Sequence, residues 1–156
     1  YKTLIPCNIY GKYDKFSPKV AHMVPAVIYR IHEAKINNLN EIKIWGDGEA
    51  RREFMYNEDL ADAIWFSVKK INDLPQTINI GMGKDYSISE YYKKIGSVIK
   101  FNGNYIYDLT KPIGMKRKLV DSSIINELGW QPKFNLKEGI KLTYEYFLSI
   151  YKDLHL

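Results

Sequence analysis

Cysteine and histidine are scarce in this sequence, with one cysteine, Cys7, and three histidines in 156 residues. A single cysteine excludes a disulfide framework within the chain and a cysteine-rich zinc site, and it fits a cytoplasmic protein. His22, His32 and His155 do not have the spacing of metal ligands, so we expect no metal. No apolar run approaches the roughly 20 residues of a membrane span, and we expect no membrane contact.

Motifs that hold nucleotide phosphates or activate a serine are also missing. The dinucleotide fingerprint Gly-x-Gly-x-x-Gly needs a third glycine, but Tyr86 stands at that place after Gly81 and Gly83. We interpret these glycines as a turn. There is no Gly-x-x-x-x-Gly-Lys-Ser/Thr loop and no Gly-x-Ser-x-Gly elbow. The chain is therefore expected to supply binding groups and at most one acid/base.

What is present is an ordinary globular composition with a basic balance. The sequence is 46% hydrophobic and 26% charged, and its formal net charge is +5. Such a charge favours anionic partners, which are nucleic acid, membrane headgroups or phosphorylated small molecules. The lysines are spread along the chain and no RNA-binding signature is present, so we expect no nucleic acid and one anion site.

Hydrophobic periodicity predicts short strands alternating with helices, which is typical of an α/β fold. We expect strands or extended segments at 3–8, 42–45, 53–55, 77–80 and 105–107. Helices are expected at about 22–35, from 57 to about 71, at 87–100, at 122–128 and from 135 to about 151. These strands are too few and too short for a complete doubly wound sheet.

Helix starts are also readable. Asn57 is expected to cap the second helix, with Glu58 and Asp59 as first-turn acids that favour the helix dipole. Capping boxes open the helices at Ser87 and Asn135. The inner face of the second helix is predicted to consist of Leu60, Ile64, Val68 and Ile71. Packing roles are expected for Trp65 and Trp130.

Three groups of segments together are specific. The first is Pro-Cys-Asn-Ile-Tyr-Gly at 6–11 with His-Met-Val-Pro-Ala at 22–26. The second is Ile-Trp-Gly-Asp-Gly at 44–48, Arg-Arg-Glu-Phe at 51–54 and Glu-Asp-Leu-Ala-Asp-Ala at 58–63. The third is Lys-Pro-Ile-Gly at 111–114, Arg-Lys-Leu at 117–119 and Leu-Gly-Trp at 128–130.

In order and spacing these segments resemble the GDP-L-fucose synthases, and the resemblance covers essentially the whole chain. These are extended short-chain dehydrogenases, NADPH-dependent 3,5-epimerase/4-reductases of GDP-4-keto-6-deoxymannose. The Arg-Glu-Phe and Asp-Leu-Ala elements are shared by many relatives that act on nucleotide sugars. His22 at its distance from Asn8, and Trp45 before Arg52, point more narrowly to the fucose synthase branch.

The resemblance implies that this chain is the carboxyl-terminal, substrate-binding half of such an enzyme. It starts at Tyr1, without a methionine, inside an apolar stretch, which we interpret as a cut in or just before a strand. Residues 1–156 are expected to form one domain, with 1–11 a strand and turn at the edge of an absent Rossmann half. That half would carry the glycine fingerprint, the Tyr-x-x-x-Lys set and most of the NADPH site. The chain alone would then be inactive, and the full-length enzyme a homodimer.

The same resemblance assigns candidate catalytic and cofactor residues. His22 would be the acid/base for epimerisation, because imidazole can remove and return the acidic protons beside a ketone. Pro6, Cys7, Asn8 and Ile9, together with His22, would touch the nicotinamide side of the cofactor at a strand's carboxyl end. The alternatives are a capping or surface histidine and a plain buried strand.

Substrate binding would fall to Arg52, Arg30, Trp45 and Lys118. The two arginines would hold the diphosphate of a GDP-sugar, since a guanidinium matches phosphate oxygens. Trp45 would lie against nucleotide or sugar, and Lys118 would reach the guanosine end. The alternatives are a solvated helix face for Arg30, a core position for Trp45 and a solvated loop for Lys118.

One departure bears on the sugar. The family has an acidic residue that contacts the substrate where this chain has Ile113, so a related GDP-deoxyhexose or GDP-heptose is an open alternative. A nucleotide-sugar 4-epimerase or 4-reductase without the 3,5-epimerase step also fits these residues. So does a protein of another class, a non-catalytic basic binding module.

Overall fold

The computed structural model describes residues 1–17 and 19–155, and side chains up to residue 153. Its helices are α1 (Met23–Ile36), α2 (Asn57–Lys69), α3 (Ile88–Ile99), α4 (Ser123–Glu127), α5 (Leu136–Ile150) and the 3-10 helix η1 (Tyr151–His155). Its strands are β1 (Thr3–Pro6), β2 (Asn8–Tyr10), β3 (Glu41–Trp45), β4 (Arg51–Arg52), β5 (Phe54–Tyr56), β6 (Thr77–Ile80), β7 (Tyr86–Ser87), β8 (Asn104–Asp108) and β9 (Arg117–Lys118). Strands and helices alternate, which confirms the predicted α/β class.

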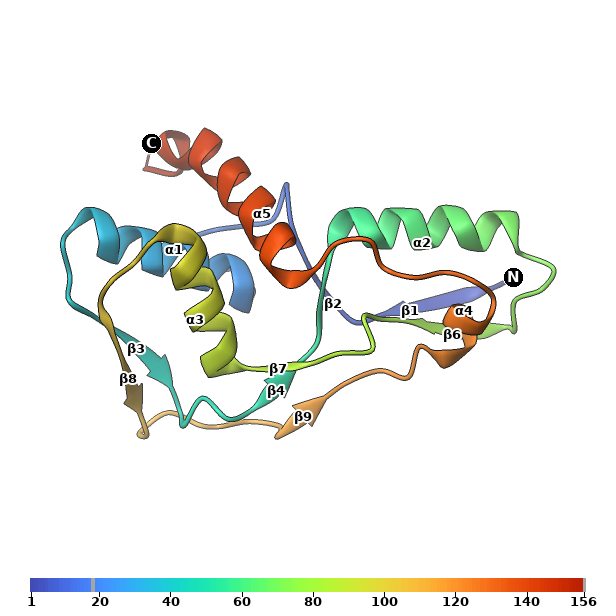
Figure 1. Cartoon of the computed structure of the whole chain (residues 1–156), viewed down its shortest axis with the longest axis horizontal. Helices are drawn as coiled ribbons and strands as arrows, with labels where there is room; N and C mark the ends of the chain where they lie inside the picture. The colour runs from blue at the N-terminus through green and yellow to red at the C-terminus, as the bar shows by residue number, and fades with distance from the viewer. Residues whose placement is uncertain (18, 156) are drawn as a thin grey trace.

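Most strand pairs are parallel and small (Figure 1). β1 pairs with β6, β2 with β5 and β3 with β8, each in parallel. β4 lies between β7, which is antiparallel to it, and β9, which is parallel. The strand predicted at 3–8 is divided, because Cys7 donates its amide to Ile80 at the end of one pair before the chain turns to the next.

Two hydrophobic clusters hold the chain together. The first joins α1, α3 and α5 to β3 and β5, with Ile28, Ile95 and Phe147 fully buried. The second lies between β1, β6, α2 and α4 and contains Met55 and Trp130. The predicted packing role of Trp130 is confirmed, since its side chain is 3% exposed.

Local sequence explains where the long helices begin. Ser87 and Asn135 each accept the backbone N–H of a glutamate three residues later, and that glutamate bonds back to the cap. The predicted cap by Asn57 is wrong. Asn57 is the first residue of α2, and its side-chain amide donates to the carbonyl of Lys12 at 3.0 Å.

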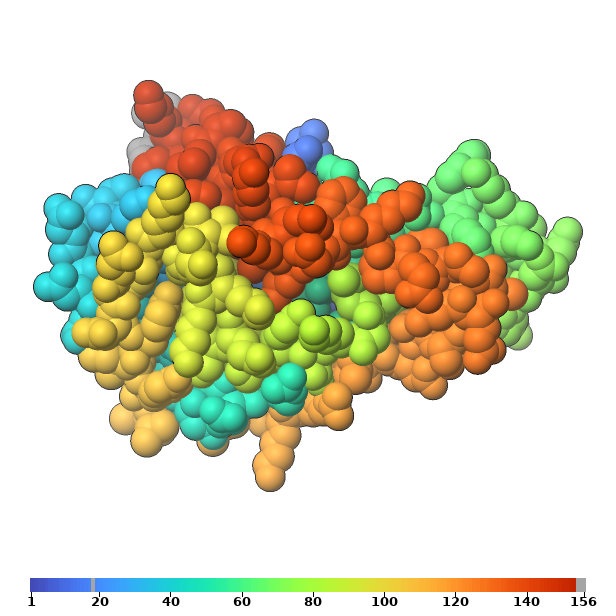
Figure 2. Space-filling view, viewed as in Figure 1, coloured from blue at the N-terminus to red at the C-terminus, as the bar shows by residue number. Residues whose placement is uncertain are grey.

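The predicted inner face of α2 is also wrong, except for Leu60, which is partly buried and packs against the second cluster. Ile64, Val68 and Ile71 are 46%, 54% and 48% exposed, and Trp65, assigned to packing, is 60% exposed. The buried side of α2 consists instead of Asp59, Ala63 and Ser67. Figures 1 and 2 show α2 (green) running along the outside of the molecule, above β1 and β6.

Asp59 explains why the polar side of α2 turns inward. Its carboxylate is fully buried and accepts the amides of Lys133 at 2.7 Å and Phe134 at 3.3 Å. Asp62, one turn later, accepts the indole N–H of Trp130 at 3.0 Å and the ammonium of Lys133 at 2.5 Å. Asp59 is therefore more than a first-turn acid, because it bonds α2 to the 130–134 loop. Together with the bonds of Asp62, it fixes which side of α2 faces that loop.

Candidate functional site

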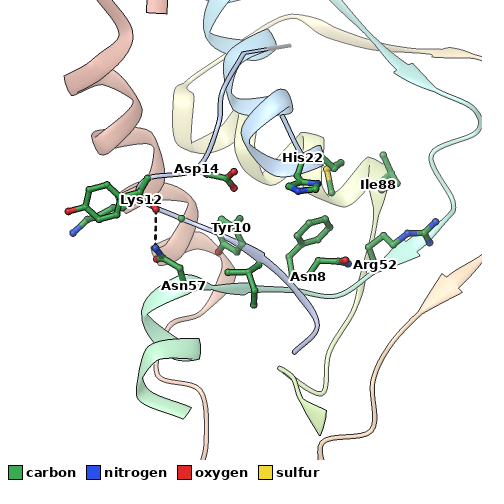
Figure 3. A pocket seen from close by; sticks show the side chains of 13 residues that line it. Asn8, Tyr10, Lys12, Asp14, His22, Arg52, Asn57 and Ile88 are labelled. Atoms are coloured by element: carbon green, nitrogen blue, oxygen red, sulfur yellow. Dashed lines mark hydrogen bonds between the residues drawn. The ribbon is translucent and has the colours of Figure 1, made fainter. Parts of the chain in front are cut away.

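A pocket of about 550 Å³ opens where β2 and β5 end and α1 begins. Figure 3 shows its lining, in which Asn8, His22 and Arg52 come from separate elements and Asp14 faces His22 across the space. β2 and β5 are parallel neighbours, so their carboxyl ends lie at one edge, where ligands collect in open α/β folds.

His22 is placed by the start of α1. It is the residue before the first helical turn, with extended φ and ψ of −70° and 171°, and its side chain makes no cap hydrogen bond. The imidazole is exposed and lines the pocket (Figure 3). The imidazole is therefore accessible to a ligand, because it does not cap the helix through a hydrogen bond.

The strand end predicted to touch a cofactor is only partly in the pocket. Asn8 and Ile9 line it, and Asn8 donates its side-chain amide to the carbonyl of Glu53 at 2.9 Å. Pro6 and Cys7 do not line it. Cys7 is buried, and burial, followed by the charge of Glu53, raises the pKa of its thiol to about 12, so the thiol is not a nucleophile at neutral pH.

Arg52 lines the pocket from β4, with its guanidinium pointing away from His22 (Figure 3). Lys118, on the neighbouring strand β9, does not line the pocket. The parallel register of β4 and β9 places Arg52 opposite Lys118. Arg52 donates to the carbonyl of Arg51 at 2.8 Å. Within the described residues, no carboxylate lies within 4.0 Å of Arg52 or of Lys118. Both cations are thus available to an anion.

The structure does not bring Arg30 or Trp45 to the pocket. Arg30 donates to the hydroxyl of Tyr92 at 2.6 Å and to the carbonyl of Lys43 at 2.5 Å, so its guanidinium ties α1 to α3 and β3. Trp45 ends β3 with 64% of its surface exposed, and the ammonium of Lys111 lies 5.9 Å from its ring centroid. It is neither a core tryptophan nor a lining residue of this pocket.

Sequence reasoning missed two residues of the lining. Asp14 is the one carboxylate among the described residues that line the pocket, and it follows a left-handed residue, Tyr13, with φ of 68°. Asn57 lines the other side, and a β-carbon on Gly11 would lie 2.2 Å from its Oδ1 atom. Gly11, with φ of 152°, is therefore required for the turn that carries Asp14.

Glu53 is a third residue whose role the motif alone did not reveal. Its side chain is 1% exposed and accepts the amides of Met82 at 2.6 Å, Gly83 at 2.9 Å and Val120 at 3.0 Å. One carboxylate thus holds two loops against the strand that carries Arg52. The signal available in the sequence was the Arg-Glu-Phe motif, in which this glutamate follows an arginine.

The described residues provide no loop that could hold a dinucleotide by its phosphates. The glycine pair that most resembles such a loop, Gly81 and Gly83, belongs to a turn whose amides at Met82 and Gly83 are already bonded to Glu53. Groups of three or more metal-ligand side chains are also absent from the described part. None of the described helices is long and apolar enough to cross a bilayer.

The fold and the pocket define an α/β domain with a pocket at the ends of two parallel strands, and the comparisons with known proteins identify its family. The family model described as "NAD dependent epimerase/dehydratase family" matches residues 1–81. The chain therefore belongs to the NAD-dependent epimerase/dehydratase family. This confirms the prediction, made from the sequence motifs, that the chain is related to nucleotide-sugar epimerases and reductases.

Individual relatives agree. The chain is 52% identical over 149 residues to a GDP-L-colitose synthase of Yersinia pseudotuberculosis, covering 96% of this chain and 48% of that one. It is 44% identical to a GDP-L-fucose synthase of Azorhizobium caulinodans, again with 96% and 48% covered. A solved GDP-mannoheptose C4 reductase from Campylobacter jejuni with NADP bound matches at 30% identity and a TM-score of 0.83, covering 94% and 52%. The chain spans about half the length of these relatives.

Proposed function

We propose that the chain is the substrate-binding, carboxyl-terminal half of an NADPH-dependent GDP-sugar epimerase/reductase of the cytoplasm. The observation that supports it best is the shared pocket, which is lined both by an exposed imidazole and by an arginine without an acidic partner. Diphosphate would bind to Arg52 and Lys118, and the sugar would extend toward His22 and Asp14. NADPH would be held mainly by the half that this chain does not contain.

In this proposal His22 is the acid/base. It would transfer the proton on one face of the carbon beside the keto group, and a second group on the opposite face would complete the exchange that inverts that centre. Asp14, the pocket's carboxylate, would face the uncharged sugar hydroxyls, since its charge repels a diphosphate and favours the end away from Arg52. The curated relatives are named for GDP-L-colitose and GDP-L-fucose, which favours a GDP-linked sugar as substrate.

The alternative within the family is a 4-reductase that does not epimerise. The 30% identity to a GDP-mannoheptose C4 reductase favours keeping it. Solvent deuterium incorporation beside the keto group separates the two, because reduction at carbon 4 alone does not require it.

Arg52→Ala is expected to weaken GDP binding by about 10- to 100-fold, the value of one or two charge-assisted hydrogen bonds. Isothermal titration calorimetry of the chain with GDP measures it. Arg30→Ala is the matched control, since it removes the same charge from a side chain outside the pocket and should change the dissociation constant by about twofold or less. Equal losses in both variants would contradict the assignment of the diphosphate to Arg52.

The chain alone is expected to consume no NADPH with GDP-4-keto-6-deoxymannose, because its described residues provide no loop for the dinucleotide phosphates. The other half would cover the exposed apolar surface formed by Ile64, Trp65 and Val68 on α2 and by Ile71 just beyond its end. Absorbance at the nicotinamide band follows the reaction, and intact mass identifies the species in the assay. Steady NADPH oxidation by a pure 156-residue chain would overturn the inactivity of this half.

A further inference from the structure

Four cations lie on two paired strands, and the strand register sorts them into two pairs. β4 contributes Arg51 and Arg52, and β9 contributes Arg117 and Lys118. Arg51 lies opposite Arg117, and Arg52 lies opposite Lys118. Because successive side chains of a strand point to opposite faces, one pair lies on each face of this small sheet.

Asp85 bonds to both arginines of the first pair. Its side chain is 5% exposed, Arg51 Nε lies 2.9 Å from Oδ1, and Arg117 Nε bonds to Oδ2. Arg51 also donates to the backbone carbonyl of Asp85 at 2.9 Å and lies 3.4 Å from the carboxylate of Glu90. Burial would raise the pKa of Asp85, but the hydrogen bonds from Arg117 and Arg51 outweigh it and hold that pKa below its usual value.

The second pair has no such partner. No acidic side chain of the described residues lies within 4.0 Å of Arg52 or Lys118. In the 111–116 loop, Gly114 lies close to Arg52, since a β-carbon at Gly114 would lie 3.8 Å from Nη2. A guanidinium and an ammonium side by side without a counter-charge repel each other, so they gain from an anion that bridges them.

β9 has few other anchors. Every residue from Lys111 to Lys118 is exposed, and Figure 2 shows this segment (light orange) along the lower edge of the molecule. Its parallel pairing with β4 holds it, as do the bonds from Arg51 N to Lys116 O at 2.7 Å and from Val120 N to the carboxylate of Glu53 at 3.0 Å. The bond between Arg117 and Asp85 adds a side-chain tie at the residue next to Lys118.

We propose that Asp85 is a positioning residue for anion binding, holding β9 so that Lys118 stands beside Arg52 and occupying the two arginines that would otherwise compete. The ligand class is a nucleoside diphosphate, with inorganic pyrophosphate as its minimal probe. This inference rests on the proposed function, because it concerns the same cations that would hold the diphosphate.

A double-mutant cycle tests it, with GDP and pyrophosphate titrated into the chain by calorimetry. Lys118→Ala is expected to weaken GDP binding about 10-fold in the wild-type background but about twofold or less beside Asp85→Asn, because Lys118 is then no longer held in place. Arg52→Ala should weaken binding in both backgrounds. A general loss of stability would leave the Lys118 effect unchanged, so the cycle separates positioning from scaffolding.

Arg117→Gln serves where Asp85→Asn fails to fold, because the Arg117 side chain is 60% exposed and its loss leaves Asp85 bonded to Arg51. It should reduce the Lys118→Ala effect in the same way, and Lys116→Gln, with the same charge change on an exposed neighbour, should not. An equal Lys118→Ala effect in all backgrounds overturns the inference alone. A wild-type chain that binds neither GDP nor pyrophosphate overturns the proposed function and the inference with it.

Discussion

Glu53→Ala will lower the free energy of unfolding by about 3 kcal/mol or more, since it leaves several backbone N–H groups without an acceptor. Those groups belong to Met82, Gly83 and Val120, at 2.6, 2.9 and 3.0 Å from the carboxylate. Water cannot replace the acceptor at no cost, because the Glu53 side chain is 1% exposed. The midpoint of urea denaturation, followed by circular dichroism, measures the loss.

Two further variants make the result specific. Glu53→Gln keeps one acceptor oxygen but turns an NH₂ group toward an amide donor, so we expect an intermediate loss of about 1 to 2 kcal/mol. Glu49→Ala, at an exposed position in the loop before β4, should stay within about 0.5 kcal/mol of wild type. If Glu53→Ala unfolds at the wild-type urea concentration, the carboxylate does not hold these loops.

The same carboxylate shows where sequence reasoning stopped. Capping boxes at Ser87 and Asn135 were predictable because the interaction spans only three residues of chain. The bonds of Glu53 reach 29 to 67 residues away, and no local pattern contains them. The Arg-Glu-Phe motif indicates that these residues are important, but it does not reveal their roles. The structure shows that the glutamate holds two loops and that the arginine lines the pocket.

The predicted buried face of α2 is wrong for a different physical reason. Its apolar stripe of Ile64, Val68 and Ile71 obeys helical spacing, and spacing alone predicts that such a stripe is buried. The described chain instead packs the side of Asp59, Ala63 and Ser67, because Asp59 bonds to the 133–134 backbone. Periodicity locates an apolar face, but it does not say which protein segment covers that face.

The sequence predicted some residues that line the pocket, His22 and Arg52, but it also predicted Arg30, which does not line it. His22 and Arg52 line one pocket, as the motif spacing led us to expect that they would. Arg30 carries the same guanidinium, but Tyr92 and the Lys43 carbonyl lie within its reach and engage it inside the fold. Whether a charged side chain meets a ligand or its own protein depends on these tertiary neighbours, which the residue type does not encode.

His22→Asn is expected to lower solvent deuterium incorporation beside the keto group by about 10²- to 10⁴-fold, the usual value of a general base. The experiment requires an enzyme that contains both halves, incubated in D₂O with its keto-sugar nucleotide and analysed by mass spectrometry. The size of asparagine and its polar amide keep the shape of the site, while the group that accepts a proton is lost. GDP affinity should remain within about threefold of wild type.

Arg52→Ala is expected to affect KM and the exchange rate differently from His22→Asn. Removal of a group that binds substrate and transition state alike raises KM and leaves the exchange rate at saturation nearly unchanged. Loss of a proton acceptor does the reverse, lowering the rate at saturation with little change in KM. His22 and Arg52 line one cavity but lie on α1's amino end and on β4, so the two effects should be separable in single variants. Unchanged deuterium incorporation in His22→Asn would assign the proton transfer to another group, so that this histidine only lines the pocket. A wild-type enzyme that incorporates no deuterium beside the keto group would favour the 4-reductase alternative.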